Sequence, residues 1–145
     1  MPRRRAVPRR DSWTTRTLRT RAAVVAARDL RVVLSSAPPG EALRLASALV
    51  DAGAAACVSV VPGVRSVYRW QGAVRRDRES LLVVKTTRGA LARCLRTLAF
   101  EHPYEVPEAL VLEPSSALAA YGRWIRETSV PDARKAVRRR GLRKS

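Results

Sequence analysis

The sequence has little cysteine and histidine for its length of 145 residues. Its two cysteines, Cys57 and Cys94, form no C-x-x-C pair and lack the dense spacing of a secreted disulfide scaffold. This absence favours a reduced, intracellular setting, and we expect a cytoplasmic protein. The single histidine, His102, is the one imidazole available to any site.

Long apolar runs are also lacking. Although 46% of the residues are hydrophobic, no run approaches the roughly 18 to 20 residues that a membrane-spanning helix requires. The length suits one ordinary domain better than two. We therefore expect a single soluble core without a membrane span.

Catalytic and nucleotide-binding motifs are missing as well. A hydrolase would need a nucleophile such as Cys57 or a serine, a base such as His102 and an orienting group such as Glu105, but no G-x-S-x-G or cysteine-protease signature joins them. No G-x-x-x-x-G-K-[ST] or G-x-G-x-x-G loop occurs either. The sequence therefore predicts a protein that is not an enzyme.

Positive charge is abundant, and it is concentrated at the two ends of the chain. Of the formal charge of +17, residues 1–28 carry +8 and residues 130–145 carry +6, which leaves +3 for residues 29–129. High charge with little apolar periodicity is typical of disordered segments. We predict a folded domain over 29–129 between two disordered basic tails.

Three interpretations of these tails remain open. The arginine-rich, acid-poor N-terminus is similar to an organellar transit peptide, which makes an organelle the alternative location. Basic tails also attract polyanions by counterion release, without sequence specificity. Only three of the 29 basic residues are lysines, so a GC-rich coding bias, or a misplaced start codon, would account for the tails without any function.

Apolar periodicity predicts the element order β-α-β-β-α-β-α. The expected segments are a strand at 30–36, a helix at 39–53, a β region in which 54–63 and 66–72 are close partners, a strand at 80–87 after a charged turn at 75–79, a helix at 89–100, a strand at 105–114 and a helix at 117–128 capped by Ser115 and Ser116. This order indicates an α+β fold of the ferredoxin-like (split βαβ) kind, with an antiparallel sheet, both main helices on one face and an extra C-terminal helix. An uncovered sheet face and free edges favour oligomerisation.

The aromatic residues Tyr68, Trp70 and Tyr104 are expected near basic residues such as Arg69 and Lys85. Such a mixture occurs on platforms for single-stranded nucleic acid. Packing or a subunit interface explains it at least as well, and the RNP aromatic motif is missing.

The segment EHPYEVP at 101–107 holds His102. Pro103 disfavours helical geometry at the preceding residue, so His102 should lie at or just past a helix end. Either it is a turn residue that hydrogen-bonds locally, or it is a pocket residue or metal ligand. Cys57 and Cys94 are donors that suit copper or zinc, but each falls in an apolar element where a cysteine usually belongs to the core.

Several fragments together resemble one family, the divalent-cation tolerance proteins (CutA). They are VVLSSAP (32–38), AAACVSVVPGVRSVYRWQG (54–72), LLVVKTT (81–87), HPYEVPEALVLE (102–113) and YGRWI (121–125). The resemblance implies a ferredoxin-like subunit of a homotrimer, in which strands of neighbouring subunits pair. It further implies a divalent-cation tolerance protein that responds to metal ions and binds copper or other divalent ions weakly at clefts between subunits, with no cofactor required for folding.

The resemblance also implies a set of site residues. The metal-binding candidates are His102 and Glu105, and the cleft or interface candidates are Tyr104, Lys85, Tyr68 and Trp70. Cys57 is a further metal-binding candidate because its thiol suits copper or zinc, and not because of the resemblance. Some family members have a cysteine and a second histidine, both implicated in copper binding, where this chain has Ser35 and Glu101. A hydroxyl and a carboxylate are harder donors, so we expect weak copper binding that depends on His102.

Two other classes of function remain. The first is a small-ligand sensor or trimeric interaction scaffold resembling nitrogen-regulatory signalling proteins, which is an analogy at the level of the fold. The second is binding of nucleic acid or an anionic surface through the basic tails.

Overall fold

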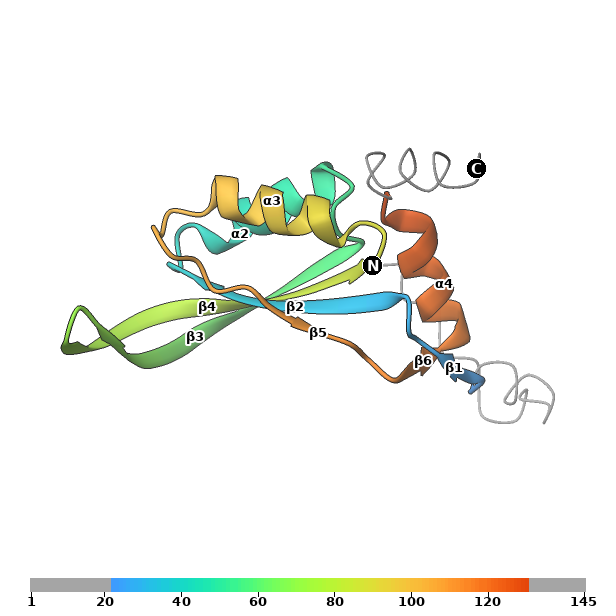
Figure 1. Ribbon diagram of the computed structural model, residues 1–145, viewed down its shortest axis with the longest axis horizontal. Coiled ribbons are helices and arrows are strands. Elements are labelled where there is room, and N and C mark those ends of the chain that lie inside the picture. Colours follow the sequence, from blue (N-terminus) through green and yellow to red (C-terminus); the bar gives the residue numbers. More distant parts are fainter. Residues whose placement is uncertain (1–21, 131–145) are drawn as a thin grey trace, which may run out of the picture.

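The computed structural model describes residues 22–130, and most of the two expected tails, residues 1–21 and 131–145, lies outside this range. The described chain is built around a four-stranded antiparallel sheet with the strand order β3-β4-β2-β5 (Figure 1). Its strands are β2 (Leu30–Ala37), β3 (Cys57–Trp70), β4 (Ala73–Thr87) and β5 (Leu110–Leu112). The prediction of an α+β fold with an antiparallel sheet is confirmed.

Two helices, α2 (Ala42–Asp51) and α3 (Leu91–Glu101), lie on one face of this sheet (Figure 1). The apolar side chains that recur at helical spacing face the sheet and form the main core with alternate residues of β2 and β4. The largest of these core side chains, each at most 1% exposed, are Val33, Leu45, Leu49, Leu82, Val84, Cys94 and Leu98. No helix within residues 22–130 is long and apolar enough to cross a membrane.

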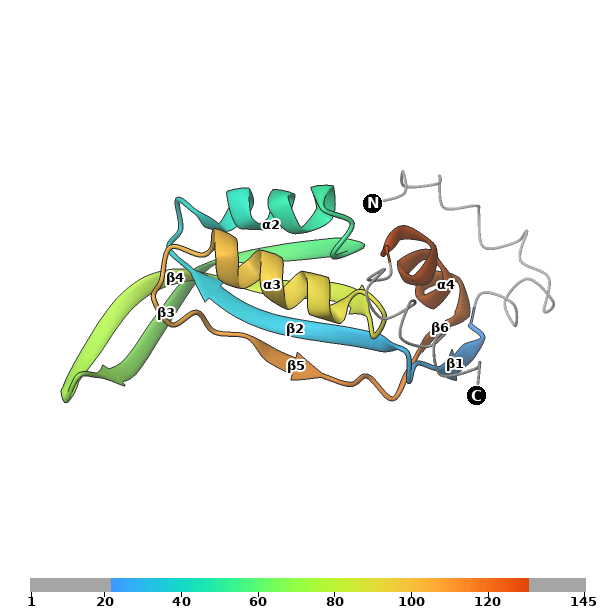
Figure 2. The same ribbon diagram turned by 45° about the horizontal axis from the view of Figure 1, so that its top comes forward.

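The strands β3 and β4 extend far beyond the rest of the sheet as a two-stranded arm (Figure 2). The ladder between β2 and β4 ends at the pair Ala37 and Ser80, whereas the ladder between β3 and β4 continues to Trp70 and Ala73. We call residues 64–79 the arm. A two-residue loop, Gln71 and Gly72, closes it with positive φ at both positions (48° and 79°), as a type I′ turn requires.

The arm corrects two expectations from the sequence. The segments 54–63 and 66–72 are not separate strands, because they form the single strand β3 with a bulge between Val61 and Val64. The charged segment 75–79 is not a turn, since it lies inside β4. All five of its residues are charged, as is common in a turn, because four of them are exposed on the arm and only Glu79 is buried.

A second, small sheet pairs β1 (Val24–Ala26) with β6 (Ser116–Leu118). The sequence did not predict either strand. The expected tail boundary at residue 28 is therefore wrong for residues 22–28, where Ala and Val form an apolar stretch between arginines. Ser116 belongs to β6 and does not cap the last helix α4 (Ala119–Thr128), whose N-cap is Leu118.

The helix α4 covers only one end of the other sheet face. There Ile125 packs with Ala27, Leu30 and Ala56 in a second apolar cluster. The Asp29 carboxylate accepts two hydrogen bonds from Arg126, at 2.6 and 2.9 Å, which fixes α4 to the turn before β2.

Candidate functional site

The sheet surface opposite α2 and α3 is apolar, and beyond the end under α4 no described element covers it. We call this surface the open face. Its apolar side chains come from all four strands: Val32, Leu34, Val61, Leu81, Val83, Leu110 and Leu112. Leu110 is 58% exposed and Leu112 is 48% exposed. Exposed contiguous apolar surface of this kind marks an interaction site.

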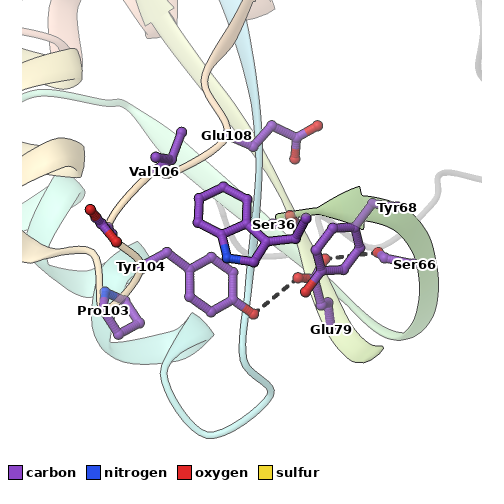
Figure 3. Close-up of a pocket in the computed structure, with 10 residues that line it drawn as sticks. Ser36, Ser66, Tyr68, Glu79, Pro103, Tyr104, Val106 and Glu108 are labelled. Carbon is purple, nitrogen blue, oxygen red and sulfur yellow. Dashed lines mark hydrogen bonds between the residues drawn. The ribbon is translucent and has the colours of Figure 1, made fainter. Parts of the chain in front are cut away.

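A cleft of ≈ 550 Å³ lies where the arm leaves the sheet, between β3, β4 and the segment that follows α3 (Figure 3). Aromatic and acidic side chains dominate its lining. The lining residues are Ser36, Ser66, Tyr68, Trp70, Glu79, Pro103, Tyr104, Glu105, Val106 and Glu108. We call this hollow the cleft.

The bulge in β3 decides which side chains enter the cleft. Two residues of β3, Pro62 and Gly63, stand opposite one residue of β4, and an extra residue moves all later side chains of a strand to the other face. Tyr68 and Trp70 therefore lie on the same side of the arm as Glu79. Without the bulge they would point to the side of the helices.

Glu79 is the buried carboxylate of the cleft, with 4% of its surface exposed. It accepts hydrogen bonds from the Ser66 hydroxyl at 2.8 Å and from the Tyr104 hydroxyl at 3.0 Å (Figure 3). Burial and the bond to Glu79 both raise the pKa of Tyr104, so its hydroxyl stays protonated and remains a donor. A buried charge needs such donors, which explains why these three side chains meet.

A second acidic group lies beside Glu79 on the same side of the arm. The Tyr68 hydroxyl donates a hydrogen bond to Asp77, and this bond raises the pKa of Tyr68. With Glu105 and Glu108 on the opposite wall, the cleft combines several carboxylates with aromatic faces. Such surroundings favour a cation.

His102 caps the C-terminal end of α3 and holds the segment that forms one wall of the cleft. Its Nδ1 accepts a hydrogen bond from the Tyr104 N–H at 3.1 Å, and its Nε2 lies 2.9 Å from the Ser36 carbonyl oxygen. This arrangement places the proton on Nε2. His102 is 8% exposed, and both ring nitrogens are hydrogen-bonded within the chain, so His102 acts here as a positioning residue.

The three candidate metal ligands do not form one site within the described chain. Glu105 lies on the cleft wall, whereas Cys57 lies on the open face opposite Lys85. In residues 22–130 no group of three or more His, Cys, Asp or Glu side chains is placed to hold a metal ion. His102, Glu105 and Cys57 therefore do not meet at one metal site within the described part of the chain.

The two positions where this chain departs from the copper-binding pattern are engaged elsewhere. Ser35 points into the main core and is fully buried. Glu101 accepts a hydrogen bond from Arg44 Nη1 at 2.8 Å, and this pair joins α2 to α3. Neither side chain is available to complete a site around His102.

Of the four cleft or interface candidates, Tyr68, Trp70 and Tyr104 line the cleft and Lys85 does not. Lys85 lies on the open face, where its Nζ donates to Ser59 Oγ at 2.6 Å and to the Val83 carbonyl at 2.9 Å. Sequence reasoning missed Glu79, the central acidic residue. Its place at the end of a charged run suggested a solvated turn. Only the alternation of side chains along β4 would have placed Glu79 on the buried side of the strand.

Comparisons with known proteins support one family. The family model described as CutA1 divalent ion tolerance protein matches residues 31–128. The divalent-cation tolerance protein CutA of Thermus thermophilus is 44% identical over 99 residues, which are 68% of this chain and 96% of that protein. The chloroplastic protein CutA of Arabidopsis thaliana is 36% identical over 99 residues, 68% of this chain and 54% of that protein.

Solved structures of similar chains agree. CutA from Synechococcus elongatus superposes with a TM-score of 0.73 at 40% identity, covering 77% of this chain and 99% of that one. The same protein complexed with a Bis-Tris molecule gives a TM-score of 0.68 at 40% identity over 73% of this chain and 99% of that one. The family model matches residues 31–128, and both the sequence relatives and the solved structures bear the CutA name. This chain therefore belongs to the CutA1 divalent ion tolerance protein family.

Proposed function

We propose that this chain is a ferredoxin-like subunit of a homotrimer that serves divalent-cation tolerance by holding a small cationic ligand in the cleft. The observation that carries the proposal is the set of carboxylates and aromatic rings around the buried Glu79. The cleft volume of ≈ 550 Å³ lies within the roughly 300 to 1,000 Å³ of small-molecule sites. A lone metal ion would leave most of this space unused.

The trimer is supported by what one subunit leaves uncovered. The strand order β3-β4-β2-β5 with both main helices on one face supports a ferredoxin-like arrangement. Among the described residues, no second layer covers the open face beyond α4. The edges of the arm and of the short strand β5 are also unpaired in one subunit. Pairing with neighbouring copies would cover the apolar face and satisfy these edges.

Light scattering of the full chain tests the trimer. We expect three times the chain mass of 16.0 kDa, and the variant Leu34→Asp, which places a charge on the open face, should dissociate it. The matched control is Leu43→Asp, because Leu43 is 72% exposed on the outer side of α2. A wild-type protein that stays monomeric at micromolar concentration would refute the trimer.

The nature of the ligand follows from the cleft lining. A small organic amine can place its charge over an aromatic ring such as Trp70 and near Glu105 and Glu108. The Synechococcus elongatus structure with Bis-Tris supports an amine as a probe. Divalent metal ions are the second candidate, since carboxylates from two neighbouring subunits could together supply oxygen donors. Such donors suit magnesium or calcium better than copper.

Calorimetry with the full-length protein separates these ligands. Bis-Tris, MgCl2, ZnCl2 and CuCl2 are titrated into the wild type and into Glu105→Gln/Glu108→Gln. The matched control, Asp51→Asn/Glu127→Gln, removes two exposed carboxylates outside the cleft. We expect the cleft variant to lose Bis-Tris affinity by about tenfold or more, equivalent to about 1.4 kcal/mol, while the control keeps it.

Full Bis-Tris affinity in the cleft variant would place the amine elsewhere and refute the ligand proposal. The same titration tests the copper expectation, for which His102→Ala should remove the tightest site. Since both ring nitrogens of His102 are hydrogen-bonded within the subunit, copper could bind there only by displacing one of these bonds.

Three further expectations accompany this proposal. We propose that the protein is not an enzyme and needs no cofactor to fold, so that a chelator should leave its circular dichroism unchanged. We also propose a cytoplasmic location, with an organelle as the alternative that the chloroplastic plant relatives favour. Polyanion binding through the tails concerns residues that lie mostly outside the described range.

A further inference from the structure

The arm has two chemically different faces. Successive residues of a strand point to opposite sides, and the ladder of β3 with β4 fixes which residues share a side. One side carries the acidic and aromatic residues of the cleft. The other side, which we call the arginine face, carries Arg65, Val67, Arg69, Val74, Arg76 and Arg78.

Within residues 22–130, the arginines of this face have no acidic partner. Arg65 stands directly opposite Arg78 in the ladder, and like charges in this position destabilise a strand pair. Among the described residues no carboxylate forms an ion pair with Arg65, Arg76 or Arg78. The ribbon therefore bears a repulsion that a bound anion would relieve.

The carboxylates of the arm are occupied on its other side. Asp77 accepts the Tyr68 hydroxyl, and Glu79 accepts the hydroxyls of Ser66 and Tyr104. Arg69 makes only a long contact of 3.4 Å from Nη1 to the Gly72 carbonyl. The arginine face thus carries four of the five arginines of the arm, whereas both carboxylates lie on the other side together with Arg75.

The excess charge of the predicted folded domain is concentrated on the arm. Residues 29–129 contain thirteen basic and ten acidic side chains, and residues 65–79 alone contain five arginines and two carboxylates. The remainder of 29–129 then holds equal numbers of each sign. This localisation distinguishes the arm from a generally basic surface, since random substitution would spread the arginines.

The shape of the arm suits a polyanion. It projects from the body as a two-stranded ribbon (Figure 2). The arginines of the arginine face are exposed. Arginines two residues apart on one strand, such as Arg76 and Arg78, lie about 7 Å apart along the ribbon. A two-stranded ribbon also fits the major groove of a nucleic-acid duplex.

We propose that the arginine face binds the phosphate backbone of nucleic acid. Guanidinium groups match phosphate oxygens in pairs, and the contact needs no sequence recognition. This site is separate from the cleft and from the basic tails. Because the cleft lies on the other side of the ribbon, both ligands can be bound at once.

The test uses the full chain, so that the tails are present in every protein compared. The arm variant is Arg65→Gln/Arg76→Gln/Arg78→Gln, and the matched control is Arg28→Gln/Arg88→Gln/Arg123→Gln, which removes three exposed arginines at the other end of the molecule. Fluorescence anisotropy follows a short labelled DNA duplex and a short single-stranded RNA between about 50 and 200 mM salt.

We expect the arm variant to lose about tenfold or more in duplex affinity at low salt and the control to lose less. The slope of log K against log salt should fall by about 0.9 for each phosphate contact removed from a duplex. Equal losses in the two variants would overturn the proposal, because charge alone would then explain binding. Light scattering adds a second check: if the arm variant loses its oligomeric state and the control keeps it, the arginines bind a neighbouring subunit and the proposal is wrong.

Discussion

The two faces of the main sheet carry similar apolar side chains in opposite surroundings. On the helix side, Val33, Leu82 and Val84 are fully buried. On the open face their strand neighbours Leu34 and Val83 are equally apolar, yet no helix of the described chain covers them. An apolar side chain therefore indicates that a face needs cover, but it does not indicate whether the cover comes from the same chain.

The most disruptive way to test this difference is to truncate one leucine on each face. Leu82→Ala on the helix side should lower the free energy of unfolding by about 2 to 5 kcal/mol, because it leaves a cavity in a fully enclosed core. Leu34→Ala on the open face should cost the isolated subunit less and should mainly weaken assembly. Chemical denaturation at low and high protein concentration measures both effects.

Both variants could instead lower the free energy of unfolding equally at every protein concentration. The open face would then be buried within one chain, and the two faces would not differ in how they are covered. The sheet would then be closed by residues outside 22–130.

The two cysteines report on the two faces separately. Cys94 is fully buried on the helix side, and burial raises the pKa of its thiol to about 11, so it should react with a thiol reagent only after unfolding. Cys57 lies on the open face, and we expect it to be protected in the trimer and to be freed by Leu34→Asp. Reaction rates in native and denaturing buffer provide the measurement.

A rapid reaction of Cys94 in the native protein would show that the core opens far more readily than its burial implies. Equal protection of Cys57 in the wild type and in Leu34→Asp would remove the link between the open face and assembly.

Two buried hydroxyl groups on the helix side of the sheet differ in whether they form a hydrogen bond. Thr86 Oγ1 donates to the Ala54 carbonyl at 2.7 Å, whereas the buried Ser35 hydroxyl has no hydrogen-bond partner among the described residues. Ser35→Ala should leave the free energy of unfolding unchanged or raise it by about 1 kcal/mol. Thr86→Val should lower it, since it leaves a buried carbonyl without its donor.

A loss of stability in Ser35→Ala comparable to that in Thr86→Val would mean that the Ser35 hydroxyl does have a partner. Thermal unfolding of both variants at one protein concentration decides this.

The smallest expected effect lies at the end of the sheet under α4. The hydrogen bond from Arg126 holds the pKa of Asp29 below its usual value of 3.8. A carboxyl with a lowered folded pKa stabilises the protein above the unfolded pKa, and this contribution is lost as the pH falls through the folded pKa. Asp29→Asn should therefore cost up to about 1 kcal/mol at neutral pH, and the difference should shrink below pH 3.8.

The control Asp51→Asn changes an exposed carboxyl that makes no ion pair among the described residues. A difference between wild type and Asp29→Asn that does not change with pH would rule out an ionic contribution from Asp29.

Much of the architecture was predictable because it follows from local periodicity. The spacing of Ala46 and Leu49 predicts α2, the apolar run at 80–87 predicts a strand, and Pro103 places His102 at a helix end. The gathering of Tyr68, Trp70 and Tyr104 was also expected, from their resemblance to a known pattern. Each of these features depends on residues a few positions apart or on a motif read as a unit.

The tertiary structure alone decided features that depend on register between distant segments. The pairing of β1 with β6 joins residues about ninety positions apart, as Val24 with Leu118 shows, and neither short segment has a periodic signal. The bulge between Val61 and Val64 cannot be read from β3 by itself, because it exists only relative to β4. Yet this bulge brings Tyr68 to the side of Glu79 and leaves four of the five arginines of the arm on the opposite side.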